Sequence, residues 1–166
     1  DGRYVLNELD GEYDLIAVDA YRPPYIPWHL TTSEFFTELQ GQLDDSGVVA
    51  INVGRTPTDR RLVEAMTATM LDVFPTVHTI DVPETFNTIL VATTVPTPYE
   101  NIANNLQNLP VEASPILRTA LQLAVDGETE TVASETVFTD DLAPVELMVD
   151  SIVLNFLLSD GVEQLR

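Results

Sequence analysis

Asp14-Leu15-Ile16-Ala17-Val18-Asp19-Ala20 is an almost unbroken apolar run, and it decides the fold class. Such a run predicts a strand that is buried on both faces of a parallel sheet. The next segment, Tyr21-Arg22-Pro23-Pro24-Tyr25-Ile26-Pro27, contains three prolines, which exclude a regular helix and a central strand. The sequence therefore predicts a buried strand at 14–20 followed by a stiff loop.

A helix, a strand, a second helix and a pair of strands are predicted after this loop. Thr31 or Thr32 is expected to cap the first helix, and Thr31 has the spacing of a capping box with Glu34. Apolar spacing predicts this helix up to about residue 43, a strand at 48–53, a helix at 59–74, and an antiparallel hairpin of strands at 77–82 and 88–92. The alternation predicts an α/β fold with a mostly parallel sheet, right-handed crossovers and helices on both faces.

The C-terminal part of the sequence is less regular. We expect helices at 101–109, 115–125 and 145–158, and a polar, acidic connection at 126–135. Because no repeat or low-complexity linker divides the chain, one domain is expected at 1–166, with a sheet core at 1–95 and a helical extension at 96–166. The chain begins with Asp and its first residues have the pattern of a domain interior, so we expect this domain to be N-terminally incomplete.

The charge balance limits the partners of the protein. Seven basic residues, all of them Arg, and 27 acidic residues give a formal net charge of −20, and such a surface repels the phosphates of nucleic acids. Two interpretations stay open: attraction of cationic substrates such as polyamines, or an acidic surface that keeps the protein soluble. No apolar run approaches the roughly 20 residues of a membrane-spanning helix. The absence of Cys excludes disulfides and a Cys nucleophile.

The end of the predicted strand at 14–20 is the leading candidate for a functional site. In open α/β sheets ligands bind beyond the carboxyl ends of the strands, which places Asp19 and the loop at 21–28 at the mouth of a site. A carboxylate there can accept a proton from an attacking group, or it can cap the following turn. The dipeptide Asp1-Gly2 suits an ordinary turn, or a site that binds an exocyclic amine while a ring approaches the backbone.

Other chemistry-bearing residues do not define a site. His29 and His78 are far apart and have no carboxylate at helical spacing, so no metal site is expected. The pair Asp140-Asp141 suits a cation but is more typical of a helix start or a solvated turn. The sequence has no glycine-rich strand-to-helix turn for a nucleotide or sulfonium cofactor. This predicts either further sequence before residue 1 or a loss of cofactor binding.

Taken together, several of these segments resemble the second half of the spermidine synthase (polyamine aminopropyltransferase) domain. The segments that carry the resemblance are 1–6, 13–20, 27–36, 43–52, 87–92 and 139–146. The last two are similar to larger bacterial spermidine synthase-like proteins, in some of which the domain follows a membrane transporter-like region. The resemblance is strongest at 1–53 and 86–94 and weak at 96–136.

The resemblance implies a Rossmann-like, class I S-adenosylmethionine-dependent methyltransferase fold. It also implies decarboxylated S-adenosylmethionine as the donor of an aminopropyl group and a small amine as the acceptor, with no metal. Asp1 matches the acid that contacts the adenine, with Gly2 beside it. Asp19 matches the acid that takes the proton of the attacking amine, and Asp19 and Ala20 border the donor.

The substrate loop departs from the family. Tyr21, Arg22 and Tyr25 fall in the loop that contacts the acceptor, and Arg22 stands where family enzymes have a second Asp. A cation there repels a protonated diamine, at a cost of about 1–4 kcal/mol at close range. The tyrosine-rich diamine pocket is not evident either, because 81–86 has another composition. These departures imply an acceptor other than putrescine.

Three hypotheses follow from the sequence. The first is an aminopropyltransferase-like enzyme with Asp19 as base. The second is a related methyltransferase that uses S-adenosylmethionine itself. The third is a non-catalytic ligand-binding or oligomerisation domain of a larger membrane protein. The resemblance implies a cytoplasmic location, or a cytoplasmic domain behind a membrane-embedded N-terminal region, with a homodimer among the expected assemblies.

Overall fold

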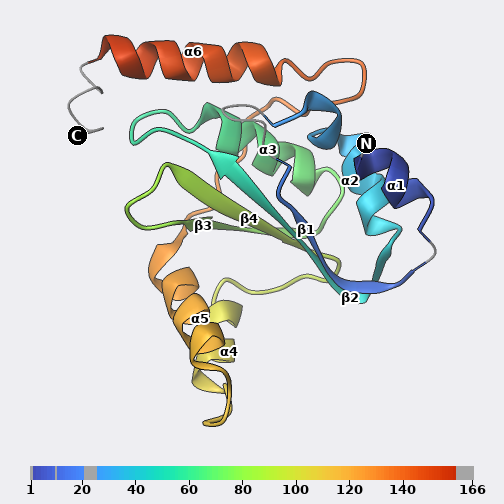
Figure 1. The fold of residues 1–166 in the computed structure, drawn as a ribbon, viewed down its shortest axis with the longest axis vertical. Helices are drawn as coiled ribbons and strands as arrows, with labels where there is room; N and C mark the ends of the chain where they lie inside the picture. Colours follow the sequence, from blue (N-terminus) through green and yellow to red (C-terminus); the bar gives the residue numbers. More distant parts are fainter. Residues whose placement is uncertain (1, 10, 21–25, 160–166) are drawn as a thin grey trace.

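The described part of the chain forms a five-stranded mixed sheet with helices packed around it. A computed structural model describes residues 2–9, 11–20 and 26–159. The strand order is β1-β2-β4-β3-β5 (Figure 1). The strands are β1 Tyr13–Val18, β2 Leu43–Gly54, β3 Thr76–Asp81, β4 Asn87–Thr93 and β5 Glu128–Thr129.

The pairing confirms the predicted α/β class and the predicted hairpin, but the sheet is mixed and not mostly parallel as expected. β1 pairs with β2 in parallel, whereas β4 lies antiparallel between β2 and β3, and β5 lies antiparallel on the outer edge of β3. Strands β1, β2 and β3 therefore run in one direction, and their carboxyl ends meet at one edge of the sheet. Gly54 at the end of β2 pairs with Asn87 at the start of β4. This edge is where a ligand is expected in an open α/β sheet.

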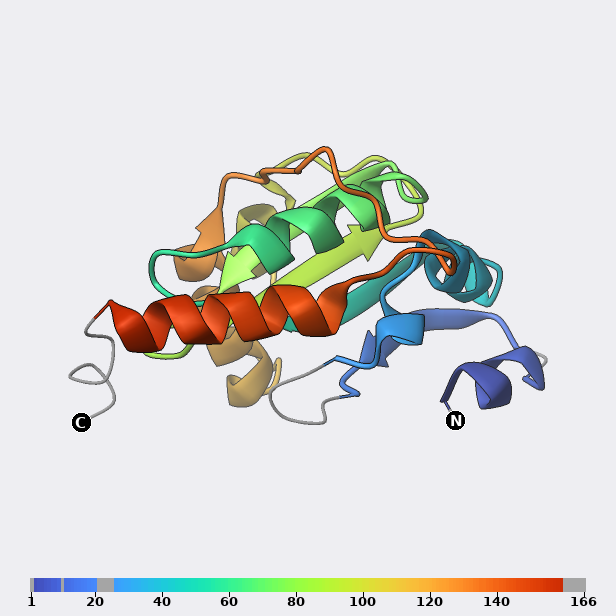
Figure 2. The same ribbon diagram turned by 90° about the horizontal axis from the view of Figure 1, so that it is seen from above.

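Six helices and a short 3₁₀ turn at Trp28–Leu30 accompany the sheet in the described part of the chain. In Figures 1 and 2, α3 and α6 lie on one side of the sheet and the α4/α5 pair on the other. The helices are α1 Gly2–Asn7, α2 Ser33–Gln40, α3 Arg61–Leu71, α4 Asn101–Gln107, α5 Pro115–Gly127 and α6 Val145–Leu158. All the predicted helices are confirmed, and α6 has the predicted bounds. None of the helices in the described ranges is long and apolar enough to cross a membrane.

The hydrophobic core lies where α2, α3 and α6 meet β2 and β4. Side chains at every second position of β2 point into it, which is the pattern of a strand with one fully covered face. The helices contribute residues at three- and four-residue spacing, as amphipathic helices do. Fully or almost fully buried members are Phe35, Phe36, Leu39, Val49, Ile51, Val53, Met66, Met70, Leu90 and Phe138.

The prediction that the strand at 14–20 is buried on both faces is wrong. β1 is an edge strand that pairs only with β2 among the described residues, and Leu15 in its middle is 60% exposed. An apolar run indicates that a strand can be buried, but it does not indicate which other elements cover that strand. In the described part of the chain, no second strand lies against the outer edge of β1.

The helix after the loop, α2, is capped by Thr32, one of the two residues that were expected to cap it. The Phe35 N–H donates to Thr32 Oγ1 over 3.2 Å, so Thr32 satisfies one of the unpaired donors of the first turn of α2. The prediction of a capping box between Thr31 and Glu34 is wrong. Thr31 Oγ1 instead donates to the Trp28 carbonyl, and Glu34 Oε2 accepts from the backbone N–H of Asp140.

The polar connection predicted at 126–135 contains a strand. In β5, Thr129 pairs with Thr79 of β3. The Glu128 carboxylate lies 2.9 Å from Nδ1 of His78, and both side chains are almost fully buried. The sequence pattern missed this strand because its polar side chains bury one another across two strands instead of facing water.

Replacing Gly127 by Ala should destabilise the edge formed by β3 and β5. A Cβ at Gly127 would lie 2.2 Å from the Asp81 carbonyl oxygen, and a backbone atom cannot move aside cheaply. We expect Gly127→Ala to lower the free energy of unfolding by about 1–3 kcal/mol in urea denaturation. Gly2→Ala is the matched control, since nothing lies within 4 Å of a Cβ there. Equal stability of the two variants would contradict the close approach at Gly127.

Candidate functional site

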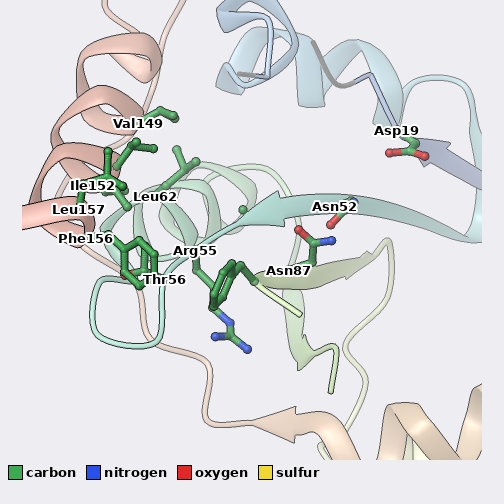
Figure 3. A pocket seen from close by; sticks show the side chains of 13 residues that line it. Asp19, Asn52, Arg55, Thr56, Leu62, Asn87, Val149, Ile152, Phe156 and Leu157 are labelled. Carbon is green, nitrogen blue, oxygen red and sulfur yellow. The ribbon is translucent and has the colours of Figure 1, made fainter. Parts of the chain in front are cut away.

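A cavity of about 530 Å³ lies at the carboxyl ends of β1 and β2. Its polar lining comes from the sheet edge and includes Asp19, Asn52 and Asn87, whereas its apolar lining comes mostly from α6 (Figure 3). This volume is in the range of small-molecule binding pockets. The cavity therefore stands at the position at which open α/β sheets bind ligands.

Asp19 lies at the end of the cavity away from α6 (Figure 3). It directly follows β1, its side chain is exposed, and it makes no hydrogen bond or ion pair with another described residue. The turn that Asp19 would cap in the alternative interpretation lies at 21–25, outside the described residues. The carboxylate can accept a proton or a hydrogen bond from a molecule in the cavity.

Asn52 also lines this cavity, between Asp19 and the α6 wall (Figure 3). Its Oδ1 is buried and has no hydrogen-bond partner among the described residues. Leaving such a group unpaired costs about 1–3 kcal/mol, and a ligand N–H would remove that cost. Sequence reasoning missed Asn52, although one signal was available: it is the single amide within the apolar run at 48–53.

A cluster of Arg55, Arg60 and Asp81 borders the cavity. Arg60 Nη1 lies 2.7 Å from Asp81 Oδ2, and Arg55 Nε lies 3.3 Å from Asp81 Oδ1. Burial acts to raise the pKa of Asp81, but hydrogen bonds from Arg60 and Thr88 outweigh it and hold that pKa below its ordinary value. Two guanidinium groups share one carboxylate, so the cluster has a net charge of +1. The Arg55 guanidinium extends away from α6 (Figure 3).

The apolar wall of the cavity depends on how α6 is held. The side chains of Val149 and Ile152 are buried, and the Phe156 ring meets the Phe86 ring edge to face with centroids 5.5 Å apart. Arg61 of α3 donates to Ser151 Oγ of α6 over 3.1 Å. These contacts place a helix from the end of the chain against the carboxyl end of β2, about 100 residues earlier in sequence.

The other predicted site residues lie outside this cavity or outside the described residues. Ala20 is partly buried against the core beside Asp19. Gly2 is the exposed first residue of α1 and does not line the cavity. The candidate ligand residues Asp1, Tyr21, Arg22 and Tyr25 lie outside the described residues.

The histidines do not form a metal site in the described part of the chain. His78 contacts Glu128 through Nδ1 and Thr97 through Nε2, each over 2.9 Å. No group of three His, Asp or Glu side chains with metal-binding geometry occurs at 2–9, 11–20 or 26–159.

Asp140, which sequence analysis associated with a cation or a turn, belongs to a structural ion cluster. Arg3 of α1 donates to Asp140 over 2.8 Å and to Glu38 of α2 over 2.6 Å, and Thr32 Oγ1 donates to Asp140 over 2.7 Å. Hydrogen bonds from Arg3 hold the pKa of Glu38 and of Asp140 below their ordinary values. The cluster joins α1, α2 and the segment that leads into α6.

The Arg3 cluster makes the free energy of unfolding depend on pH. Glu38 and Asp140 have folded-state pKa values below the ordinary 4.5 and 3.8, so the folded state binds fewer acid protons than the unfolded state. Their stabilisation is therefore complete above about pH 5 and is lost as the pH falls through the folded-state pKa values. We expect Arg3→Met to flatten the fall in unfolding free energy below about pH 5, measured by urea denaturation at a series of pH values.

Arg118→Met is the matched control, because Arg118 donates only to the backbone carbonyls of Leu109 and Pro110 among the described residues. It should leave the pH profile as it is. A slope that Arg3→Met does not alter would show that the two carboxylates are not held by Arg3.

The chain matches two curated proteins, but no family model. It is 31% identical to a probable polyamine aminopropyl transferase of Bifidobacterium longum, over 89% of this chain and 36% of that protein. It is 36% identical to a polyamine aminopropyltransferase of Vibrio vulnificus, over 44% of this chain and 23% of that protein. The chain thus spans little more than a third of the length of the first relative.

Solved structures share the fold. A probable spermidine synthase of Corynebacterium glutamicum matches with a TM-score of 0.55 at 21% identity, over 84% of this chain and 53% of that one. A spermidine synthase in complex with the transition-state analogue AdoDATO matches with a TM-score of 0.54 at 17% identity, over 74% of this chain and 45% of that one. Human methyltransferase-like protein 13, in complex with SAH, gives 0.50 at 20% identity, over 86% and 64%.

The mixed sheet and its neighbours therefore define a class I methyltransferase-like α/β protein. Within that class, the chain is spermidine synthase-like, and its partial coverage fits the C-terminal part of the relatives.

Proposed function

We propose that the chain is part of an enzyme that transfers an aminopropyl group from decarboxylated S-adenosylmethionine to an amine, with Asp19 as the base. The observation that carries this proposal is the Asp19 carboxylate, which has no partner among the described residues and faces a cavity with an unpaired Asn52 acceptor. The relatives named polyamine aminopropyltransferase support the same reaction class.

The chemistry required of these residues is simple. The acceptor nitrogen attacks the carbon next to the sulfonium, a C–N bond forms, and the C–S bond breaks to leave a neutral thioether. The amine must be neutral when it attacks, and Asp19 takes the proton that the nitrogen loses. Asn52 lines the cavity and its Oδ1 has no partner among the described residues, so we assign it the role of accepting a hydrogen bond from the amine and thereby fixing its direction.

The residues present fit a part of the donor. A carboxylate and an amide oxygen that have no partner among the described residues suit a ligand that carries positive charge and N–H donors, as this donor does. Asp1, Gly2 and Ala20 remain the proposed contacts to its adenosyl part. Tyr21, Arg22 and Tyr25 remain the proposed loop beside the acceptor. Because Arg22 replaces an acid in that loop, the proposed acceptor is an amine other than putrescine.

The test is an assay of the full-length protein that contains this chain. It is incubated with decarboxylated S-adenosylmethionine and a panel of amines, and mass spectrometry follows the aminopropylated product and the thioether coproduct. Product from at least one amine supports the proposal. No turnover together with no binding of the sulfonium donor contradicts it.

A second candidate function is methyl transfer from S-adenosylmethionine, which the SAH-bound structural neighbour favours. The same assay distinguishes it, since methylated amine and S-adenosylhomocysteine would appear with the ordinary donor alone. Binding of either donor without product would indicate the non-catalytic alternative.

The 166-residue chain by itself should bind the donor weakly. Its sequence has no glycine-rich turn to hold the adenosyl and sulfonium groups. In calorimetric titration we expect a dissociation constant at least about tenfold above that of the full-length protein. Equal affinities would show that these residues alone make up the donor site.

A further inference from the structure

We propose that the acceptor is a primary amine with one charged end and an apolar body, such as an alkylamine or arylalkylamine, and that diamines are poor substrates. This inference rests on the proposed function, because it takes Asp19 as the group that receives the amine. It adds the class of molecule that fills the rest of the cavity.

The first observation is the apolar wall opposite Asp19. Side chains of α6 form this wall, and in Figure 3 they lie at the other end of the cavity from Asp19. Leu62 of α3 and the Phe86–Phe156 ring pair extend it toward the sheet. An amine whose nitrogen is at Asp19 therefore points its carbon chain at aliphatic and aromatic groups, which gain free energy from burying an apolar body.

The second observation is that no carboxylate among the described lining residues lies at the apolar end of the cavity. Asp19 is the only acidic residue among the described residues that line the cavity. The far ammonium of a diamine would lie against the partly exposed α6 wall and find no counter-charge there among these residues. An ammonium that loses part of its hydration without gaining a partner is disfavoured, whereas a methyl or phenyl end at the same place is favoured.

The third observation is the sign of the nearby charge. Arg55 and Arg60 share the single carboxylate of Asp81, and Arg55 also lines the cavity. The resulting net charge of +1 repels a second ammonium that turns back from the apolar wall toward the sheet edge. Both the α6 wall and the sheet edge at Arg55 are therefore unsuitable for a cation.

The test compares hexylamine with 1,6-diaminohexane, which differ only in the far ammonium, as acceptors for the full-length protein. We expect kcat/KM for hexylamine to exceed that for the diamine by at least about tenfold, because only the diamine carries an unpaired charge into the apolar end. An equal or higher kcat/KM for the diamine would overturn the inference.

Two variants make the test specific for the wall. Phe156→Asp places a carboxylate at the apolar end and should shift the hexylamine-to-diamine ratio of kcat/KM toward the diamine by at least about tenfold. Leu154→Asp adds the same charge on α6 at a residue that is 56% exposed and does not line the cavity, and it should leave the ratio unchanged. Equal shifts in both variants, or none in Phe156→Asp, would contradict the assigned wall. Thermal unfolding of each variant shows whether it is folded.

The outcome also separates this inference from the proposed function. If no amine of any kind is converted, aminopropyl transfer fails as the function. Calorimetric titration with the two amines then decides the inference alone, since tighter binding of hexylamine supports the apolar site and tighter binding of the diamine rejects it.

Discussion

Replacing Asp19 by Asn should lower kcat for aminopropyl transfer by about 10²–10⁴-fold. Asn has nearly the same size and shape, but its amide cannot take the proton that the attacking amine loses. The side chain is exposed and makes no hydrogen bond with another described residue, so its replacement should change the free energy of unfolding by less than about 0.5 kcal/mol. Steady-state kinetics on the full-length protein and urea denaturation measure the two quantities.

Asp14→Asn is the matched control for this experiment. Asp14 is an exposed carboxylate on β1, the strand that Asp19 follows, but it does not line the cavity. It should leave kcat within about twofold of the unaltered protein, whereas Asp19→Glu, which keeps the carboxylate but displaces it, should fall between the two. A loss of less than about threefold in Asp19→Asn would remove Asp19 from the role of base.

Periodicity predicted the elements whose contacts repeat along the sequence. α3 buries residues at helical spacing, and the β3–β4 hairpin joins neighbouring segments, so both were accessible from the sequence. The burial of β1 and the existence of β5 were not. The exposure of Leu15 depends on which strand lies beside it, and β5 depends on a pairing between Thr129 and Thr79. Neither the neighbour of β1 nor the pairing of β5 produces a periodic pattern in the sequence.

The candidate site divides in the same way. Asp19 could be selected because the end of an apolar strand has a known place in α/β sheets. Asn52 was predicted to lie in a strand and the residues of α6 to lie in a helix, but neither was predicted to belong to a site. Their meeting in one cavity joins residues about 100 positions apart. The apolar end of the cavity, and with it the proposed acceptor class, is therefore a result of the tertiary structure.

The second large effect is expected from Phe138, which lies in the segment before α6. Its side chain is fully buried. Its backbone carbonyl accepts from Ser33 N–H, and its N–H donates to Thr69 Oγ1, each over 2.9 Å. Phe138 thus fixes the segment before α6 to both α2 and α3. We expect Phe138→Ala to lower the free energy of unfolding by about 3–5 kcal/mol, a large part of the roughly 5–15 kcal/mol of a typical domain.

Val111→Ala is the control for the loss of an apolar side chain, because Val111 is 91% exposed and should cost less than about 0.5 kcal/mol. Urea denaturation of both variants provides the comparison, and a loss below about 1 kcal/mol for Phe138→Ala would contradict its place in the core. The variant also connects stability with specificity. If α6 shifts when its anchor is cut, the affinity for an apolar amine should fall while Asp19 and Asn52 keep their positions on the sheet. The loss of affinity for the apolar amine would then result from the displaced α6 wall, because Asp19 would still be in place to accept the proton.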